Sequence, residues 1–271
     1  LAIALQQAGH IVSGSDDEIF NPAKENLEKY NLLPCEIGFF ADRITPDIDL
    51  IISGMHAKAN NPELTEAKKL NLDVLSMPEF IYQHSKNKHR IVIGGSHGKT
   101  TVTGMIMHVL RLLNKQFDYL VGSKVVGFDF NIKLSNEAPI MIIEGDEYLA
   151  STELPIPKFI IYKPDVGLIN GIDWDHANVF PSFENYLEQF KKFAEMVPSD
   201  GALFAVDEPI VRKILDEAQL KLTPIFYKTF PYFVENGHFF LKYQEKSYPL
   251  QIFGKHNMQN ISAAHKICEY L

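Results

Sequence analysis

One stretch of the sequence constrains the fold more than any other. Residues 91–101 read Ile-Val-Ile-Gly-Gly-Ser-His-Gly-Lys-Thr-Thr, and helical residues follow as far as Leu112. An apolar strand, a glycine-rich turn and a helix in this order are typical of a phosphate-binding loop. Glycines allow backbone N–H groups to point at phosphate oxygens, and the helix N-terminus adds positive potential. The position five residues before Gly98 is Ile93 rather than glycine, so the loop is a short form. The alternative is an ordinary glycine turn before a helix.

The residues of this loop and of a later strand predict a nucleotide and a metal ion. Lys99 is expected to reach the β- and γ-phosphates, and the Thr100 hydroxyl to hold Mg²⁺. The apolar strand 139–143 ends in Glu144-Gly145-Asp146-Glu147. Enzymes that use nucleoside triphosphates often present a metal ligand at the end of such a strand, so Glu144 is predicted to bind Mg²⁺. Three acids in four residues also fit a solvated turn.

Composition excludes several other classes of protein. The chain has 271 residues, enough for about two domains, and its 46% apolar and 22% charged residues are those of an ordinary globular protein. The net charge of −8 argues against non-specific nucleic-acid binding. No apolar run approaches the ~20 residues of a membrane helix, and no signal-peptide pattern is present. Because it has no membrane helix, the protein is expected to have no membrane partner. Cys35 and Cys268 form no ligand pattern, so a reducing cytoplasm is the expected location.

The first 88 residues predict a Rossmann-like α/β domain. Helices are expected at 1–9, 22–30, 62–70 and 78–84, and strands at 11–16, 49–54 and 73–75. The polar residues 85–89 mark a boundary, which gives two domains, 1–88 and 89–271. Asp16 ends a strand at a point where an acid often accepts a ribose hydroxyl, and a cap for the next segment is an equal alternative. The loop 55–62 also follows a strand end, where open α/β sheets bind ligands.

The rest of the chain predicts a larger α/β domain. Strands are expected at 166–170 and 201–205, and helices at 183–196 and 209–220. Residues 222–253 alternate and are rich in aromatic side chains, with Asn236-Gly237 as a hairpin turn, so a small antiparallel β-layer is expected at the sheet edge. Gly254 opens the last helix. His176 follows a strand end, where a metal ligand and an ordinary packed or surface histidine are equally compatible with the pattern.

Read together, these motifs resemble the Mur ligase family, the ATP-dependent amide-bond ligases of peptidoglycan synthesis. Four segments carry the resemblance in the right order: Gly95-Ser96-His97-Gly98-Lys99-Thr100-Thr101, Glu144-Gly145-Asp146-Glu147, Asp175-His176, and Gly254-Lys255-His256-Asn257-Met258-Gln259-Asn260. The resemblance implies that ATP binds to residues 95–101 and to His256, Asn257 and Asn260. It implies that Thr100, Glu144 and His176 bind Mg²⁺, and that Lys99, Glu144 and His176 are catalytic.

Within this family, the first domain resembles that of the members that bind UDP-N-acetylmuramate. The resemblance implies UDP-sugar contacts from Ser15, Asp16, His56 and Asn61. Two branches share this domain, one adding L-alanine and the other, a recycling branch, adding the tripeptide L-Ala-γ-D-Glu-meso-diaminopimelate. The segments 145–148 and 175–180 look more like the recycling branch, which we favour. The partners are then UDP-N-acetylmuramate and a peptide or amino-acid amine donor, and the protein is expected to be a monomer or a weak homo-oligomer.

The resemblance also implies parts that this chain does not contain. The glycine-rich loop that cradles the UDP diphosphate would precede Leu1, and a third domain would follow Leu271. We therefore expect the chain to be a piece of a longer protein, inactive by itself. Some members carry a carbamylated lysine near the position of Lys191 or Lys192, but these two are more simply solvent-facing helix residues.

Three alternatives remain beside this interpretation. A folylpolyglutamate synthase has the same superfamily motifs but lacks a separate UDP-sugar domain. A P-loop switch protein of the GTPase kind carries an Asn-Lys-x-Asp motif, which is absent from residues 101–271. A non-catalytic homologue would bind the nucleotide only, although Lys99, Thr100, Glu144 and His176 are all present in this chain.

Overall fold

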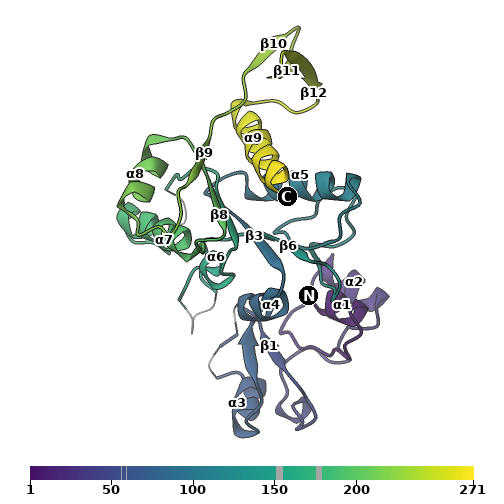
Figure 1. Cartoon of the computed structure of the whole chain (residues 1–271). Helices are drawn as coiled ribbons and strands as arrows, with labels where there is room; N and C mark the ends of the chain where they lie inside the picture. Colours follow the sequence, from purple (N-terminus) through teal and green to yellow (C-terminus); the bar gives the residue numbers. More distant parts are fainter. Residues whose placement is uncertain (56, 59, 151–154, 175–178) are drawn as a thin grey trace.

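A seven-stranded, mostly parallel sheet forms the centre of the computed structural model (Figure 1). The model describes residues 1–271 except 56, 59, 151–154 and 175–178. The strands lie in the order β5-β4-β6-β3-β7-β8-β9, and only β5 runs antiparallel to its neighbour. They are β3 (His89–Gly94), β4 (Phe117–Leu120), β5 (Ile132–Lys133), β6 (Ile140–Glu144), β7 (Val166–Ile169), β8 (Ala202–Val206) and β9 (Ile225–Tyr227).

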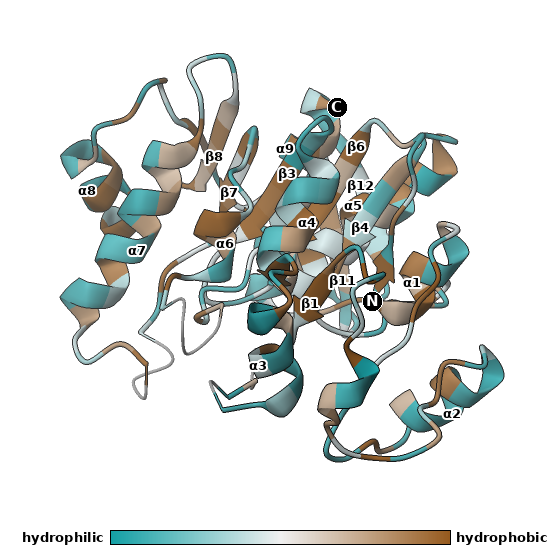
Figure 2. Ribbon diagram, turned by 90° about the horizontal axis from the view of Figure 1, so that it is seen from below, coloured by the Kyte–Doolittle hydropathy of each residue, from teal (hydrophilic) through white to brown (hydrophobic). Residues whose placement is uncertain are grey.

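Helices cover both faces of this sheet, which buries its apolar strands. On one face, α5 (Lys99–Leu112) packs against α9 (Lys255–Tyr270) and against β3 and β6. On the other lie α4 (Met77–Ser85), α6 (Lys158–Ile161), α7 (Phe183–Met196) and, beside α7, α8 (Pro209–Glu217) (Figure 1). Strands buried on both faces read as continuous apolar runs, and Figure 2 shows such strands beneath amphipathic helices. The α/β class predicted from the sequence is confirmed.

The N-terminal segment is smaller and less regular than the central sheet. It contains α1 (Ala2–Gln7), α2 (Ala23–Lys29), a 3₁₀ turn η1 (Ala41–Arg43), β1 (Ile51–Ser53), α3 (Pro62–Lys69) and β2 (Val74–Ser76), and β1 pairs in parallel with β2. Ala4 and Ile81 lie in the same core cluster as the central sheet. The division into domains 1–88 and 89–271 stays a prediction.

The strand predicted at residues 11–16 is wrong. This segment is irregular, and the Ile11 side chain is fully exposed. Within the described residues, its backbone makes one backbone hydrogen bond, from the Gly38 N–H to the Asp16 carbonyl (2.8 Å). An apolar run becomes a strand only where a neighbouring strand can take up its N–H and C=O groups, and the described chain provides none here.

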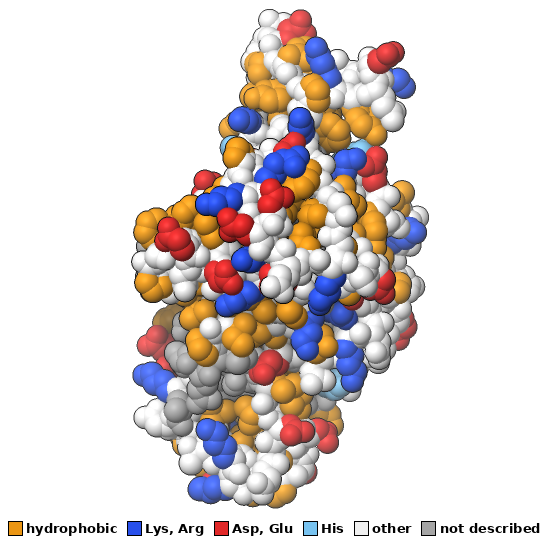
Figure 3. Space-filling view, turned by 60° about the vertical axis from the view of Figure 1, so that its left-hand side comes forward, with side chains coloured by type: hydrophobic (Ala, Val, Ile, Leu, Met, Phe, Trp, Pro, Cys, Tyr) orange, Lys and Arg blue, Asp and Glu red, His pale blue; other side chains and the backbone are white. Residues whose placement is uncertain are grey.

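The antiparallel layer predicted for residues 222–253 forms, but not at the edge of the central sheet. The edge position is taken by β9, which runs parallel to β8. A separate three-stranded sheet, β10 (Tyr232–Glu235), β11 (His238–Tyr243) and β12 (Lys246–Leu250), projects beyond α9 (Figures 1 and 3). Its first turn is the predicted one, because Asn236 and Gly237 both have positive φ (49° and 78°), as a type I′ hairpin requires.

Two strands and one helix are not predicted by the sequence. Polar Asp118 and Lys133 interrupt the short strands β4 and β5, and helix α6 is a single turn of four residues, so none of the three carries a recognisable hydrophobic period. Among the described residues, no helix combines the length and the apolar character that crossing a membrane requires.

Candidate nucleotide site

The predicted phosphate loop lies in the middle of the central sheet. Strand β3, between β6 and β7, ends at Gly94, and α5 begins at Lys99 after a Gly98 cap with φ +79°. Gly95 also has a positive φ (+132°), and a Cβ there would lie 3.0 Å from the backbone nitrogen of Asn170. A Cβ at Gly98 would also overlap the side chains of Asn260 and Asn170, so the loop needs glycine at both positions, for conformation and for space. The strand, loop and helix predicted from the sequence are confirmed.

Lys99 folds back over this loop. Its ammonium group donates hydrogen bonds to the carbonyl oxygens of Gly95 (2.8 Å) and Ser96 (3.4 Å). It also forms an ion pair with Glu147, at 2.8 Å to Oε2 and 3.1 Å to Oε1. The Lys99 side chain is 14% exposed and that of Glu147 is fully buried. The cation is thus held at the loop by two carbonyl groups and one carboxylate.

The two described side chains predicted to bind magnesium lie in contact. The Thr100 hydroxyl donates to Glu144 Oε1 (2.7 Å), and the Gly122 backbone N–H donates to Glu144 Oε2 (2.7 Å). Both side chains are partly exposed, at the start of α5 and the end of β6. A hydroxyl and a carboxylate within hydrogen-bond distance fit Mg²⁺, which usually takes one or two protein oxygens together with phosphates and water. Among the described residues, no group of three His, Cys, Asp or Glu side chains that could hold a metal is present.

An amide network joins the loop to the last helix. Asn170, just after β7, donates from Nδ2 to the carbonyl of His97 (3.3 Å) and to Oδ1 of Asn260 (2.7 Å). Its own Oδ1 accepts from the Tyr227 hydroxyl (2.6 Å), whose pKa is raised by burial and by the charge of Glu208. Sequence reasoning did not single out Asn170 or Tyr227, because their contacts join residues 57 to 90 positions apart.

The other residues predicted to contact ATP differ in how far their side chains are exposed to solvent. Asn260 is buried and donates to Asn257 Oδ1 (3.3 Å), while Asn257 donates to the Phe253 carbonyl (2.8 Å). His256 and Thr101 are exposed. Ser96 is buried, and its hydroxyl donates to the Asp173 carbonyl (2.8 Å).

The ring of His97 is exposed at the loop surface. Its Nε2 lies 3.7 Å from Asp173 Oδ2, and both side chains are more than two-thirds exposed. An ion pair in such a position contributes little to stability. The His97 side chain is therefore available to a ligand at the loop, while its backbone carbonyl belongs to the Asn170 network.

The predicted UDP-sugar contacts have structural partners of their own. Ser15 Oγ accepts from the Arg43 guanidinium (2.9 Å), and Asp16 accepts from the backbone N–H of Asp17 (2.9 Å). Asn61 caps α3, accepting from the N–H groups of Glu63 (2.8 Å) and Leu64 (3.2 Å), so a helix cap explains this residue without a ligand.

Two of the predicted residues fall outside the described part of the chain. They are His56, a predicted UDP-sugar contact, and His176, a predicted metal ligand and catalytic residue. On α7, Lys192 is exposed and Lys191 is partly buried, so of the two lysines only Lys192 clearly faces solvent.

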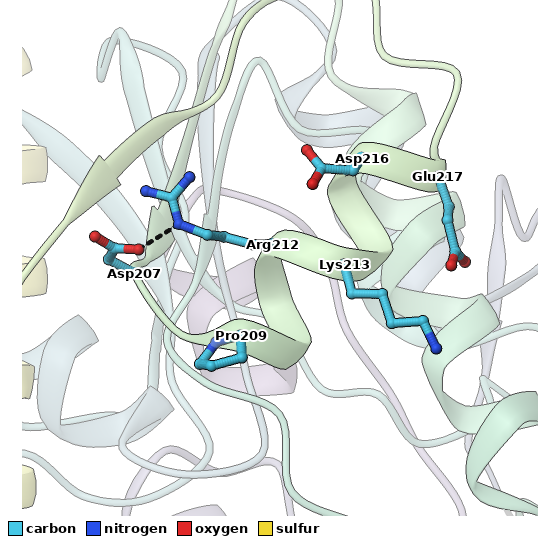
Figure 4. Close-up of a pocket in the computed structure, with 6 residues that line it drawn as sticks. All are labelled: Asp207, Pro209, Arg212, Lys213, Asp216 and Glu217. Carbon is cyan, nitrogen blue, oxygen red and sulfur yellow. Dashed lines mark hydrogen bonds and ion pairs between the residues drawn. The ribbon is translucent and has the colours of Figure 1, made fainter.

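A separate hollow lies on the surface of α8 (Figure 4). It has a volume of about 540 Å³ and is lined by Asp207, Pro209, Arg212, Lys213, Asp216 and Glu217. Two of the lining residues, Arg212 and Asp207, form an ion pair. None of the predicted site residues lines this hollow, and side chains of both charges line it, so it suggests no particular ligand.

Replacing Gly98 with alanine is expected to damage the loop. The new Cβ would lie 2.2 Å from Asn260 Oδ1 and 2.8 Å from Asn170 Nδ2, in a backbone conformation that L-residues rarely adopt. We expect a loss of about 1–3 kcal/mol in the free energy of unfolding and a Kd for ATP raised at least about tenfold, a change that corresponds to 1.4 kcal/mol. Thermal unfolding and isothermal titration calorimetry measure the two effects. Gly14→Ala is the control, because a Cβ there meets nothing within 4 Å; equal values for both variants would contradict the prediction.

Comparison with known proteins finds a matching family and several similar proteins. The family described as "Mur ligase middle domain" matches residues 93–268. The UDP-N-acetylmuramate–L-alanine ligase of Clostridium kluyveri is 30% identical over 97% of this chain and 58% of its own length. The UDP-N-acetylmuramate–L-alanyl-γ-D-glutamyl-meso-2,6-diaminoheptandioate ligase of Haemophilus influenzae is 28% identical over 98% of this chain and 61% of its own. The chain thus spans about three-fifths of the length of these relatives.

Solved structures share the fold at lower identity. A UDP-N-acetylmuramate:L-alanyl-γ-D-glutamyl-meso-diaminopimelate ligase from Neisseria meningitides has a TM-score of 0.84 and 24% identity, over 99% of this chain and 88% of that one. A UDP-N-acetylmuramate-alanine ligase from Thermotoga maritima has a TM-score of 0.73 and 20% identity, over 99% and 62%.

Proposed function

This chain belongs to the Mur ligase family, and from that membership we propose that its protein is an ATP-dependent ligase of peptidoglycan metabolism. The proposed reaction joins the carboxylate of UDP-N-acetylmuramate to the amine of the tripeptide L-Ala-γ-D-Glu-meso-diaminopimelate, in recycling. The observation that supports an ATP ligase most is the loop itself, where Lys99 lies over Gly95 and Ser96 and Thr100 contacts Glu144. A cytoplasmic location follows from this proposal.

The proposed chemistry makes a poor acyl donor reactive. A carboxylate has a poor leaving group, so the γ-phosphoryl group of ATP is first transferred to it, giving ADP and an acyl phosphate. The amine then attacks the acyl carbon, and inorganic phosphate leaves as the amide bond forms. Most of the protein's task in such a reaction is positioning and charge neutralisation. Lys99 is placed to neutralise charge on the β- and γ-phosphates. Thr100 and Glu144, with His176 as the sequence predicts, would hold Mg²⁺, whose charge would lower the repulsion between the phosphates and the incoming carboxylate.

L-Alanine is the alternative amine donor, and relatives that are L-alanine ligases support it. Several similar curated proteins are L-alanine ligases, among them that of Clostridium kluyveri. The segments 145–148 and 175–180, which look more like the recycling branch, favour the tripeptide. L-Alanine remains the alternative, and a binding-only P-loop protein is a further one.

Phosphate release tests all three functions in one experiment. The intact protein is given ATP, Mg²⁺ and UDP-N-acetylmuramate, with L-alanine or the tripeptide in parallel reactions. Release with the tripeptide alone is the expected result. Release with L-alanine alone would move the protein to the alternative branch and leave the ATP and metal assignments in place. No release with either donor, from protein that binds ATP, would favour the binding-only protein.

A further inference from the structure

The acidic segment after β6 contains a second glutamate whose role the proposed reaction leaves open. Gly145 fixes the path of this segment, because its N–H donates to the Ile93 carbonyl (2.9 Å) and a Cβ there would lie 2.8 Å from Val92. The chain therefore stays against β3 for one residue beyond the strand and then turns. This turn brings Glu147 to the loop, while Glu144 remains beside Thr100.

The two acids that follow Gly145 face different lysines. Asp146 forms an ion pair with Lys158 (2.7 Å), and although burial alone would raise the pKa of Asp146, hydrogen bonds from Lys158 and the Tyr148 N–H lower it. Glu147 instead forms an ion pair with the loop lysine, Lys99 (2.8 Å). The lysine predicted to meet the phosphates thus already has a carboxylate partner of its own, and that carboxylate is fully buried.

A chain of hydrogen bonds from α7 holds this carboxylate. The Tyr186 hydroxyl donates to Glu147 Oε1 (3.3 Å) and lies 2.9 Å from the hydroxyl of Ser96, inside the loop. Tyr186 is fully buried, and its ring packs against Phe180 and Phe190. A buried charge is tolerated where it is paired and hydrogen-bonded, and its orientation is then fixed by those partners. Glu147 therefore has little freedom to leave Lys99.

From this arrangement we propose that Glu147 is a positioning residue for Lys99, held in place through Tyr186. Its carboxylate keeps the ammonium group over Gly95 and Ser96, where it would meet the terminal phosphates of the nucleotide. The expected effect of Glu147 on turnover rests on the proposed function, whereas its expected effect on nucleotide binding does not.

The carboxylate has two opposed effects on the nucleotide. Its ion pair orients Lys99, which favours phosphoryl transfer. Its negative charge lies only 2.8 Å from the ammonium group that would meet the phosphates, and it would repel them, because charges interact over several ångströms in a partly buried site. Removing the charge should therefore lower the Kd for the nucleotide and also lower kcat. Loss of a purely structural residue would instead raise the Kd and lower kcat.

Glu147→Gln in the intact protein separates these effects. We expect the Kd for ATP, measured by calorimetry with Mg²⁺, to fall about threefold or more. We expect kcat for phosphate release to fall about tenfold or more. Glu147→Asp keeps the charge and should restore the wild-type Kd and part of kcat. Glu188→Gln, an exposed position on α7, removes one carboxylate elsewhere and should leave both values unchanged.

Tyr186→Phe is the second variant, for the case in which Glu147→Gln does not fold. It removes only the hydroxyl, so we expect a smaller fall in kcat, about threefold, with little change in Tm. A Kd for ATP that rises or stays constant in folded Glu147→Gln, or an unchanged kcat, would overturn the proposal. If the wild-type protein binds ATP but releases no phosphate with either amine donor, the proposed function fails, and the direction of the Kd change alone decides the role of Glu147.

Discussion

Lys99→Ala is expected to abolish phosphate release by the intact protein. Lys99 Nζ is bonded to Gly95 and Ser96 of the loop, so its charge lies where the β- and γ-phosphates of ATP are predicted to bind. Removing one preorganised donor of this kind typically costs a factor of about 10²–10³ in kcat. The measurement is phosphate release with ATP, Mg²⁺, UDP-N-acetylmuramate and the better of the two amine donors.

Two further variants make this result specific. Lys99→Arg keeps the charge but replaces a compact ammonium with a longer planar group, so it should recover little of the activity. Lys213→Ala, on the exposed surface of α8 (Figure 4), should behave as wild type. Lys99→Ala protein that is folded and retains activity within about threefold of wild type would contradict both the phosphate-loop assignment and the proposed reaction.

Asp118→Asn is expected to give the largest loss of stability. Asp118 is fully buried in β4 and accepts from Lys88 Nζ (2.9 Å) and from the Ser135 N–H (2.8 Å) and hydroxyl (2.8 Å). Lys88 is also buried, and its other bonds go to the carbonyls of Ser135 and Ala138. Removing one member of a buried pair leaves the other charge without its counter-ion, at a cost of about 3–5 kcal/mol in the free energy of unfolding. Urea unfolding measures this loss.

The control for this prediction removes both charges. Asp118→Asn combined with Lys88→Met should be less destabilised than Asp118→Asn alone, because the buried cation is gone as well. If the double variant is the less stable of the two, the loss comes from packing and hydrogen bonding rather than from an isolated charge.

The same carboxylate should make the wild-type protein sensitive to acid. Burial alone would raise the pKa of Asp118, but hydrogen bonds from His84, Lys88 and Ser135 outweigh it and lower the pKa. A carboxyl group whose pKa is lower in the folded state stabilises the protein above its unfolded value of about 3.9, and this contribution is lost as the pH falls below that value. The difference in stability between wild type and Asp118→Asn should therefore shrink in urea titrations below about pH 4.

Elements with local sequence signals can be predicted from the amino-acid sequence alone. The loop glycines, Lys99 and Thr100 are neighbours in the chain, so the strand–loop–helix unit can be predicted without knowledge of the tertiary structure. The same holds for the Asn236-Gly237 turn and for most helices and strands, since each depends on a period or on turn residues within a few positions. The apolar run at 11–16 shows the limit, because a strand also needs a partner to pair with.

Which side chains contact one another depends on the packing of distant elements and could not be predicted from the sequence. Lys99 and Glu147 are 48 positions apart, Asn170 and Asn260 are 90 apart, and Lys88 and Asp118 are 30 apart. The sequence shows three acids at and just beyond the end of β6, but not which of them faces Thr100, which faces Lys158 and which faces Lys99. That choice follows from the way Gly145 turns against β3 and from the burial of Tyr186, and both result from packing between elements distant in the chain.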